Sequence, residues 1–287
     1  MAAVRVASTD GVTLAVHDLG GAGPTLLLCH ATGFHGMVMA PLAAALSSRF
    51  RVVALDFRGH GGSGRPPVEV GYGWSGFGDD VLATVAALAG RPDIGPGPVL
   101  AMGHSMGGAT LFLAEQFQPG TFAGLYCFEP IVFPPGAGPA EGGDDHLVEA
   151  SRRRRQVFAS RDEAYANFAA KTPLSALTPD ALRAYVDHGF VDCDDGTVTL
   201  ACRREDEADI YRMAPANGAY TRLGEVACPV TVASGAHSGP FTPEATAALA
   251  ARLPAGRAEL FDELGHFGPF EDPPVVAESM VRAFPVT

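Results

Sequence analysis

Long uninterrupted apolar runs are missing from this chain of 287 residues. No stretch approaches the roughly 18 consecutive apolar residues that a membrane-spanning helix needs. The opening residues 1–10 also lack the apolar core that marks a secretory signal peptide. We therefore expect a cytoplasmic protein with no membrane partner.

Positive charge and cysteine are both scarce. The chain has 20 Lys and Arg against 32 Asp and Glu, which gives a formal net charge of −12 and argues against a nucleic-acid partner or an anionic membrane surface. Its five cysteines are odd in number and scattered, and they show no zinc-type spacing with histidine. We expect reduced thiols and no metal site.

The remaining composition is that of a globular protein. Hydrophobic residues make up 47% of the chain and charged residues 18%, and there is no low-complexity tract. A chain of this length fits one large domain, or a domain that carries an insertion.

Short apolar runs alternate with helical patterns along most of the chain. Runs that are apolar on both faces predict strands of a parallel sheet covered on both sides, and alternating strands and helices predict an α/β fold. Two strands joined across residues 10–11 read as an opening hairpin. The expected buried strands are Thr25–Cys29, Arg51–Leu55, Val99–Met102, Leu125–Phe128, Val230–Ala233 and Ala258–Phe261.

This alternation breaks between residues 131 and 225. About 95 residues are too many for a simple loop between neighbouring elements. We expect an inserted, mainly helical cap over the carboxyl edge of the sheet, where open α/β sheets place their ligand sites. The predicted organisation is a core from residues 1–130, the cap from 131–225, and the rest of the core from 226–287.

The most informative motif is Gly-His-Ser-Met-Gly-Gly at residues 103–108, directly after an apolar run. A strand that enters a helix through such a tight turn presents the serine hydroxyl at the top of a sheet. The glycines two residues before and two after Ser105 are needed because a Cβ there would collide with neighbouring elements.

Three further segments follow predicted strands: His-Ala-Thr-Gly-Phe at 30–34, Asp-Phe-Arg-Gly-His-Gly-Gly-Ser at 56–63, and Leu-Gly-His-Phe at 264–267. Together with the motif at 103–108, and in this order, they resemble the α/β-hydrolase fold superfamily, specifically its cap-bearing, single-domain members. The resemblance covers nearly the whole chain outside the cap. It implies a mostly parallel central sheet flanked by helices.

The resemblance also implies a set of catalytic residues. Ser105 is the expected nucleophile, and His266 is the base that a serine hydroxyl needs near neutral pH. Many relatives place an aspartate after the strand that follows the cap, but here that position holds Ser238. We expect Glu129, at the end of an earlier strand, to supply the carboxylate, because Asp262 and Glu263 lie too close to His266 in sequence.

For the oxyanion hole, the resemblance indicates the backbone N–H of Met106 and one N–H from the loop after the third strand. We assign the second donor to Thr32, with Ala31 as the alternative. Asp56 and Arg58 are interpreted as braces of the loops around the site. The run Arg152–Arg155 is interpreted as a solvated face of a cap helix rather than an anion site.

The expected function is that of a serine hydrolase that needs neither metal nor cofactor. Its substrate would be a small-to-medium carboxylic ester or lactone, cleaved through an acyl-enzyme. Hydrolysis of a C–C bond in a diketone-like substrate is one alternative, and a non-catalytic ligand-binding member of the fold is another. Haloalkane dehalogenases and epoxide hydrolases are disfavoured, because those relatives carry a carboxylate at the position of Ser105. The sequence leaves the oligomeric state open.

Overall fold

The computed structural model describes residues 3–91, 93–94, 97–136, 145–239 and 241–285. Residues 137–144 of the expected insertion therefore lie outside the described residues.

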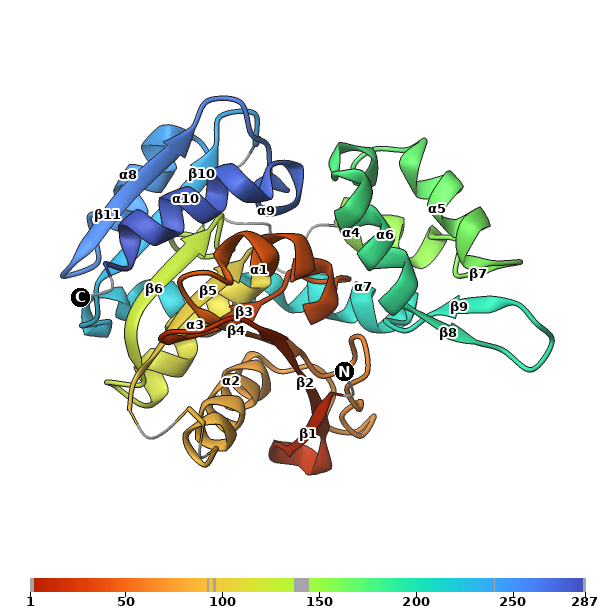
Figure 1. Ribbon diagram of the computed structural model, residues 1–287, viewed down its shortest axis with the longest axis horizontal. Helices are drawn as coiled ribbons and strands as arrows, with labels where there is room; N and C mark the ends of the chain where they lie inside the picture. The colour runs from red at the N-terminus through yellow and green to blue at the C-terminus, as the bar shows by residue number, and fades with distance from the viewer. Residues whose placement is uncertain (1–2, 92, 95–96, 137–144, 240, 286–287) are drawn as a thin grey trace.

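Eight strands of the described chain form one central sheet (Figure 1), in the order β1-β2-β4-β3-β5-β6-β10-β11. β1 pairs antiparallel with β2, and β2 antiparallel with β4. The remaining neighbours are parallel, which confirms the predicted α/β-hydrolase fold class. The strands are β1 (Val4–Ala7), β2 (Thr13–Gly20), β3 (Thr25–Cys29), β4 (Arg51–Asp56), β5 (Val99–His104), β6 (Phe122–Phe128), β10 (Val230–Gly235) and β11 (Gly256–Phe261).

Helices cover both faces of this sheet, which is why its strands are apolar on both sides. Along β3, Leu27 and Cys29 face one core layer while Leu26 and Leu28 face the other. The first layer contains side chains of α2 (Trp74–Ala89), α3 (Met106–Phe117) and α8 (Pro243–Ala250), and the second those of α1 (Ala40–Leu46) and α10 (Pro273–Ala283).

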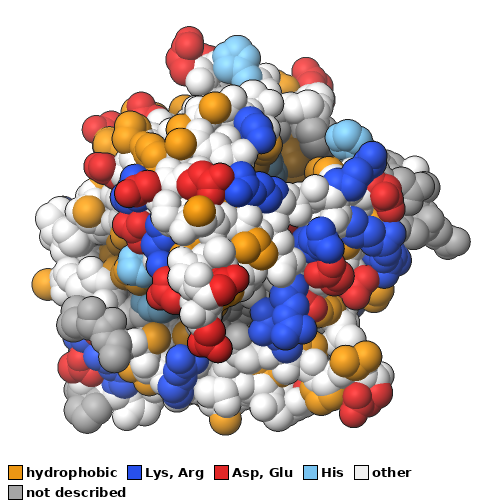
Figure 2. All heavy atoms as spheres, turned by 90° about the vertical axis from the view of Figure 1, so that its right-hand side faces the viewer, with side chains coloured by type: hydrophobic (Ala, Val, Ile, Leu, Met, Phe, Trp, Pro, Cys, Tyr) orange, Lys and Arg blue, Asp and Glu red, His pale blue; other side chains and the backbone are white. Residues whose placement is uncertain are grey.

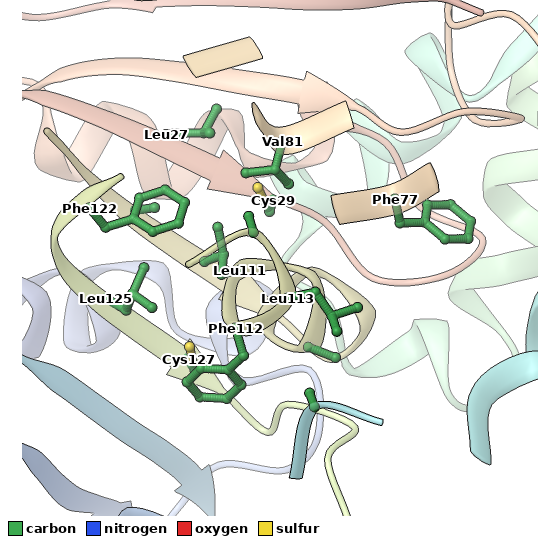
Figure 3. Packing of buried hydrophobic residues seen from close by; sticks show 14 of the residues in the cluster. Leu27, Cys29, Phe77, Val81, Leu111, Phe112, Leu113, Phe122, Leu125 and Cys127 are labelled. Carbon is green, nitrogen blue, oxygen red and sulfur yellow. The ribbon is translucent and has the colours of Figure 1, made fainter. Parts of the chain in front are cut away.

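Figure 3 shows the first layer, where side chains of β3 and β6 meet those of α2 and α3. Each large apolar side chain buried there contributes about 1.5–3 kcal/mol to folding. Of the helices described, none is both long and apolar enough to cross a bilayer.

A second group of elements lies between β6 and β10, at the right of Figure 1. We call residues 145–213 the helical lobe. Beside its helices the lobe holds a small antiparallel sheet in the order β7-β9-β8, which the sequence analysis did not anticipate. Its strands have only two or three residues each, too few to show a two-residue periodicity. The elements are α4 (Asp145–Arg153), β7 (Val157–Phe158), α5 (Arg161–Ala169), α6 (Pro179–His188), β8 (Phe190–Asp192), β9 (Val198–Leu200) and α7 (Arg204–Met213).

Hydrogen bonds attach the helical lobe to the loops that follow β3, β4 and β11. The His35 imidazole contacts the backbone carbonyl of Tyr185 at 3.0 Å. Arg65 forms an ion pair with Asp206 at 2.8 Å. After β11, the Phe270 carbonyl accepts a hydrogen bond at 2.9 Å from the backbone N–H of Thr178, the residue before α6. The lobe is thus held over the carboxyl ends of these strands.

Candidate active site

Ser105 stands in the turn between β5 and α3, with φ 54° and ψ −113°. A Cβ on Gly103 would lie 2.4 Å from the backbone carbon of Gly107, and a Cβ on Gly107 would lie 2.2 Å from the carbonyl oxygen of Cys29. Both glycines are therefore required by close backbone approach, for the reason that the motif suggested. The next residue, Met106, opens α3, and N–H groups in a first helical turn have no acceptor within their helix.

Glu129 follows β6 and also has a left-handed backbone, with φ 46°. Within the described chain, it shares a positive φ with only two other non-glycine residues, Asp10 and Ser105. Such conformations are costly and gather at functional sites. Its carboxylate is fully buried.

Three donors surround this buried carboxylate. The backbone N–H of Gly235 donates to Oε1 at 2.9 Å, and the Ser238 hydroxyl donates to Oε2 at 2.6 Å. The His266 Nδ1 contacts the same Oε2 at 2.5 Å. A carboxylate at Nδ1 fixes the proton there and leaves the lone pair on Nε2, which is the tautomer that a general base requires.

Aromatic rings hold the His266 imidazole in place. The Phe241 ring stacks on it, with centroids 5.5 Å apart and an interplanar angle of 12°. The His104 ring lies 4.8 Å from it and contacts the His266 carbonyl oxygen through Nε2 at 2.8 Å. Burial lowers the pKa of His104 well below its usual value. His104 is therefore neutral and places no positive charge beside His266.

The loop after β3, which holds Thr32, is fixed by two buried histidines. His30 Nδ1 contacts the Ala31 carbonyl at 2.7 Å, and the backbone N–H of Gly33 donates to His60 Nε2 at 3.0 Å. Burial lowers the pKa of both imidazoles, so both stay neutral. Because His60 takes the Gly33 N–H, that donor does not serve the oxyanion. Thr32 and Ala31 both remain available at the cavity wall.

A buried ion pair braces the loop after β4. Arg58 is 1% exposed and donates from Nη2 to Asp80 at 2.8 Å and from Nη1 to Asp10 at 2.8 Å. Asp56 accepts from the backbone N–H of Gly36 at 2.6 Å. Asp56 and Arg58 thus have the bracing contacts expected from the sequence.

Ser105 and His266 line one cavity of about 660 Å³, together with Thr32 and Ala31. Glu129 lies behind His266 and Met106 is buried at the start of α3, so neither side chain lines this cavity. The helical lobe forms part of the cavity wall. Among the aromatic residues of the lobe, Tyr211 lines this cavity. The lobe contributes Leu147, Pro173 and Tyr211.

Two features of the site were missed from the sequence. Ser238 was noted only as the absence of an aspartate, yet its hydroxyl binds the replacement carboxylate. Arg154 was placed on a solvated helix face, but α4 ends at Arg153, and the Arg154 guanidinium turns inward to Glu207 at 2.9 Å. The interpretation of the arginine run as wholly solvated is therefore wrong for Arg154.

Comparison with known proteins agrees with this geometry. A family model described as "Alpha/beta hydrolase family" matches residues 26–279, so the chain belongs to that family. Among curated proteins, 2-(acetamidomethylene)succinate hydrolase from Mesorhizobium japonicum is 28% identical over 192 residues, which cover 66% of this chain. The match spans 63% of that relative's own length, less than two thirds of it.

Solved structures share the fold over almost the whole chain. The crystal structure of E-2-(acetamidomethylene)succinate hydrolase superposes with a TM-score of 0.81 at 24% identity, covering 98% of this chain and 97% of that one. The enol-lactonase from Burkholderia xenovorans LB400 superposes with a TM-score of 0.71 at 21% identity, covering 98% and 99%. At these identities the likeness establishes the fold alone.

Proposed function

We propose that this hydrolase is a serine hydrolase that cleaves a small-to-medium carboxylic ester or lactone through an acyl-enzyme. The observation that carries the proposal is the 2.5 Å contact between His266 Nδ1 and the buried carboxylate of Glu129, beside a serine on a strained turn. Ser105 is the nucleophile, His266 the general base, and Glu129 the acid that orients it. The curated relative named as a hydrolase supports the reaction class.

In the first step, Ser105 Oγ attacks the substrate carbonyl while His266 Nε2 takes its proton. The N–H groups of Met106 and Thr32 bind the resulting oxyanion, and each such donor contributes about 3 kcal/mol to the transition state. His266 then protonates the leaving alcohol. In the second step His266 takes a proton from water while the water oxygen attacks the acyl carbon. The bond between that carbon and Ser105 Oγ then breaks, His266 returns the proton to Oγ, and the carboxylic acid leaves. Glu129 stabilises the imidazolium in both steps.

We propose further that residues 131–225 form a cap over this site, inserted between core segments 1–130 and 226–287. The lobe residues at the cavity wall support this division. A cover of this kind excludes water and limits substrate size, which favours small, partly apolar acyl groups. The residues named above supply the nucleophile, the base, the acid and the oxyanion donors, so the proposed reaction requires no cofactor.

The test is covalent labelling combined with turnover. A fluorophosphonate probe is expected to label the native protein at Ser105, and the variant Ser105→Ala should neither label nor hydrolyse 4-nitrophenyl butyrate. Tryptic mass spectrometry locates the label. Labelling at another residue, or unchanged turnover in Ser105→Ala, would refute the assignment. Labelling without turnover of any ester or lactone in a panel would favour the C–C hydrolase or the ligand-binding alternative.

A further inference from the structure

A second cavity, of about 440 Å³, adjoins the one that holds Ser105. The two share six wall residues: Thr32, Phe34, Leu147, Pro173, Tyr211 and Phe267. A molecule whose carbonyl sits at Ser105 therefore has room to extend into this second space, which lies between the loop after β3 and the helical lobe.

The second cavity is strongly basic, in contrast to the whole chain. Among the described residues, Arg153, Arg154, Arg155 and Lys171 line it, against a single carboxylate from Glu207. Lys171 is also the only lysine in a sequence whose net charge is −12. Positive charge concentrated along the wall of a cleft raises the local potential and attracts anions.

Not all of these cations are equally placed. Arg155 forms an ion pair with exposed Glu163 at 2.8 Å, so it belongs to the rim. Figure 2 views the side of the molecule that carries the lobe, and there Lys and Arg side chains mingle with Asp and Glu. Lys171, by contrast, contacts the neutral amide oxygen of Asn167 at 2.7 Å and keeps its charge available.

Arg154 is the most deeply placed cation of the group, with 18% of its side chain exposed. In the described part of the chain, its guanidinium contacts two acceptors, Glu207 Oε2 at 2.9 Å and the Tyr185 hydroxyl. It also lies over the Phe168 ring, 5.4 Å from the centroid. A guanidinium has five N–H donors in a planar fork that suits a carboxylate, so this pre-oriented group has capacity for a further acceptor.

The guanidinium also lies close to the reacting end of the site. A Cβ placed on Gly33, the residue after Thr32, would lie 2.4 Å from Glu207 Oε1 and 3.6 Å from Arg154 Nη1. The Arg154–Glu207 pair thus rests on the loop assigned to the oxyanion hole. An anion held there would be only a short chain away from the carbonyl under attack.

We infer that the second cavity binds a carboxylate of the substrate, and that the natural substrate is a short acyl compound carrying a free carboxylate near its scissile carbonyl. Arg154 would bind this carboxylate directly, and Lys171 would add positive charge to the same cavity wall. The inference rests on the proposed function for the position of the scissile bond. It narrows the substrate from esters and lactones in general to anionic ones.

Binding to the Ser105→Ala variant tests this inference without turnover. Monomethyl fumarate and methyl crotonate are matched ligands, because a carboxylate in the first replaces a methyl group in the second. By calorimetry at neutral pH, we expect monomethyl fumarate to bind at least tenfold more tightly than methyl crotonate. One charge-assisted hydrogen bond is enough for a difference of this size. Raising NaCl from 50 to 500 mM should weaken only the anionic ligand.

Variants in the Ser105→Ala background identify the residues responsible. Lys171→Gln changes an exposed side chain and should fold normally while reducing the preference several-fold. The double change Arg154→Gln with Glu207→Gln removes both charges of the partly buried pair together, so that neither is left unpaired. We expect it to abolish the preference. Arg152→Gln is the matched control, because Arg152 pairs with Glu149 at 2.9 Å and does not line the cavity.

Equal affinity for the two ligands would overturn the inference, and so would a preference that survives in both cavity variants. Because these measurements use a protein that lacks the nucleophile, they are separate from the labelling of Ser105. A native protein that labels at Ser105 and hydrolyses neutral esters, but shows no anion preference, would refute this inference alone.

Discussion

Replacing Glu129 with glutamine is the sharpest perturbation of the proposed catalytic relay. Gly235 donates to Oε1, so a glutamine keeps its carbonyl oxygen there and turns its NH2 group toward His266 Nδ1. The imidazole must then accept at Nδ1 and carry its proton on Nε2. In that tautomer Nε2 cannot take the proton of Ser105.

The wrong tautomer sets the size of the effect. The corresponding change in a serine-protease triad lowers kcat about 10⁴-fold, so we expect Glu129→Gln to lower kcat by about 10³- to 10⁴-fold, or about 4–5 kcal/mol. KM should change little, because the carboxylate lies behind His266 and outside the cavity. The assay is 4-nitrophenyl ester turnover with the rate of fluorophosphonate labelling, which should fall in parallel.

Two companion variants distinguish a loss of His266 orientation from a general loss of structure. Ser238→Ala removes one of three donors to the carboxylate and should cost about tenfold in kcat at most. Ser238→Asp in the Glu129→Gln background introduces a carboxylate at the residue whose hydroxyl contacts Glu129 Oε2 at 2.6 Å, the same atom that His266 contacts, and should recover part of the rate. A kcat of Glu129→Gln within tenfold of the native value, with the fold intact by circular dichroism, would refute this reasoning.

Three further predictions concern stability. Gly107→Ala should destabilise the protein by about 3 kcal/mol or more, because its Cβ would meet backbone 2.2 Å away, whereas Gly224→Ala, with open space around it, should stay within about 0.5 kcal/mol. Asp80→Asn should cost about 1.5–3 kcal/mol, because the buried Arg58 charge loses one of its two carboxylate partners and keeps Asp10. Burial lowers the pKa of His35 from 6.5 to about 4, so the unfolded chain binds a proton first, and stability should fall as pH drops from 6.5 toward 4. Between pH 7.5 and pH 5, His35→Gln should reduce this acid loss by about 2 kcal/mol.

Chemical denaturation checks all three. For the glycine pair, similar unfolding free energies for both variants would contradict the steric argument. For the ion pair, an unchanged midpoint in Asp80→Asn would show that Asp10 alone balances the Arg58 charge. For the histidine, the comparison is the difference in unfolding free energy between pH 7.5 and pH 5, and an identical difference in His35→Gln and native protein would show that His35 does not cause the loss.

The sheet and the turn at Ser105 could be predicted because short sequence patterns report their causes. Apolar runs on both faces require a covered sheet. Gly103 is required by the backbone of α3, and Gly107 by the close approach of the neighbouring strand β3. Glu129 could be singled out because the loop after β10 lacks a carboxylate and Glu129 ends the neighbouring strand. The structure places it against His266, and its catalytic role stays a prediction.

The small sheet of the lobe and the inward turn of Arg154 could not be predicted. Strands as short as Val157–Phe158 carry no period to detect. The orientation of Arg154 depends on Glu207, 53 residues later in the chain, so it is decided by tertiary packing. A run of four arginines gives no local sign of which member leaves the solvent.

The position of Glu129 places the nucleophile and the carboxylate of the proposed relay close together in sequence. The serine and its carboxylate stand 24 residues apart in sequence, at the ends of the adjacent strands β5 and β6, joined through the single helix α3. The helical lobe, which lines part of the cavity, follows both residues in the chain. At the end of β10, the Gly235 N–H and the Ser238 hydroxyl donate to the Glu129 carboxylate. The chain between β6 and β10 thus contributes to the cavity wall and, apart from Glu129 at its start, supplies neither member of this pair.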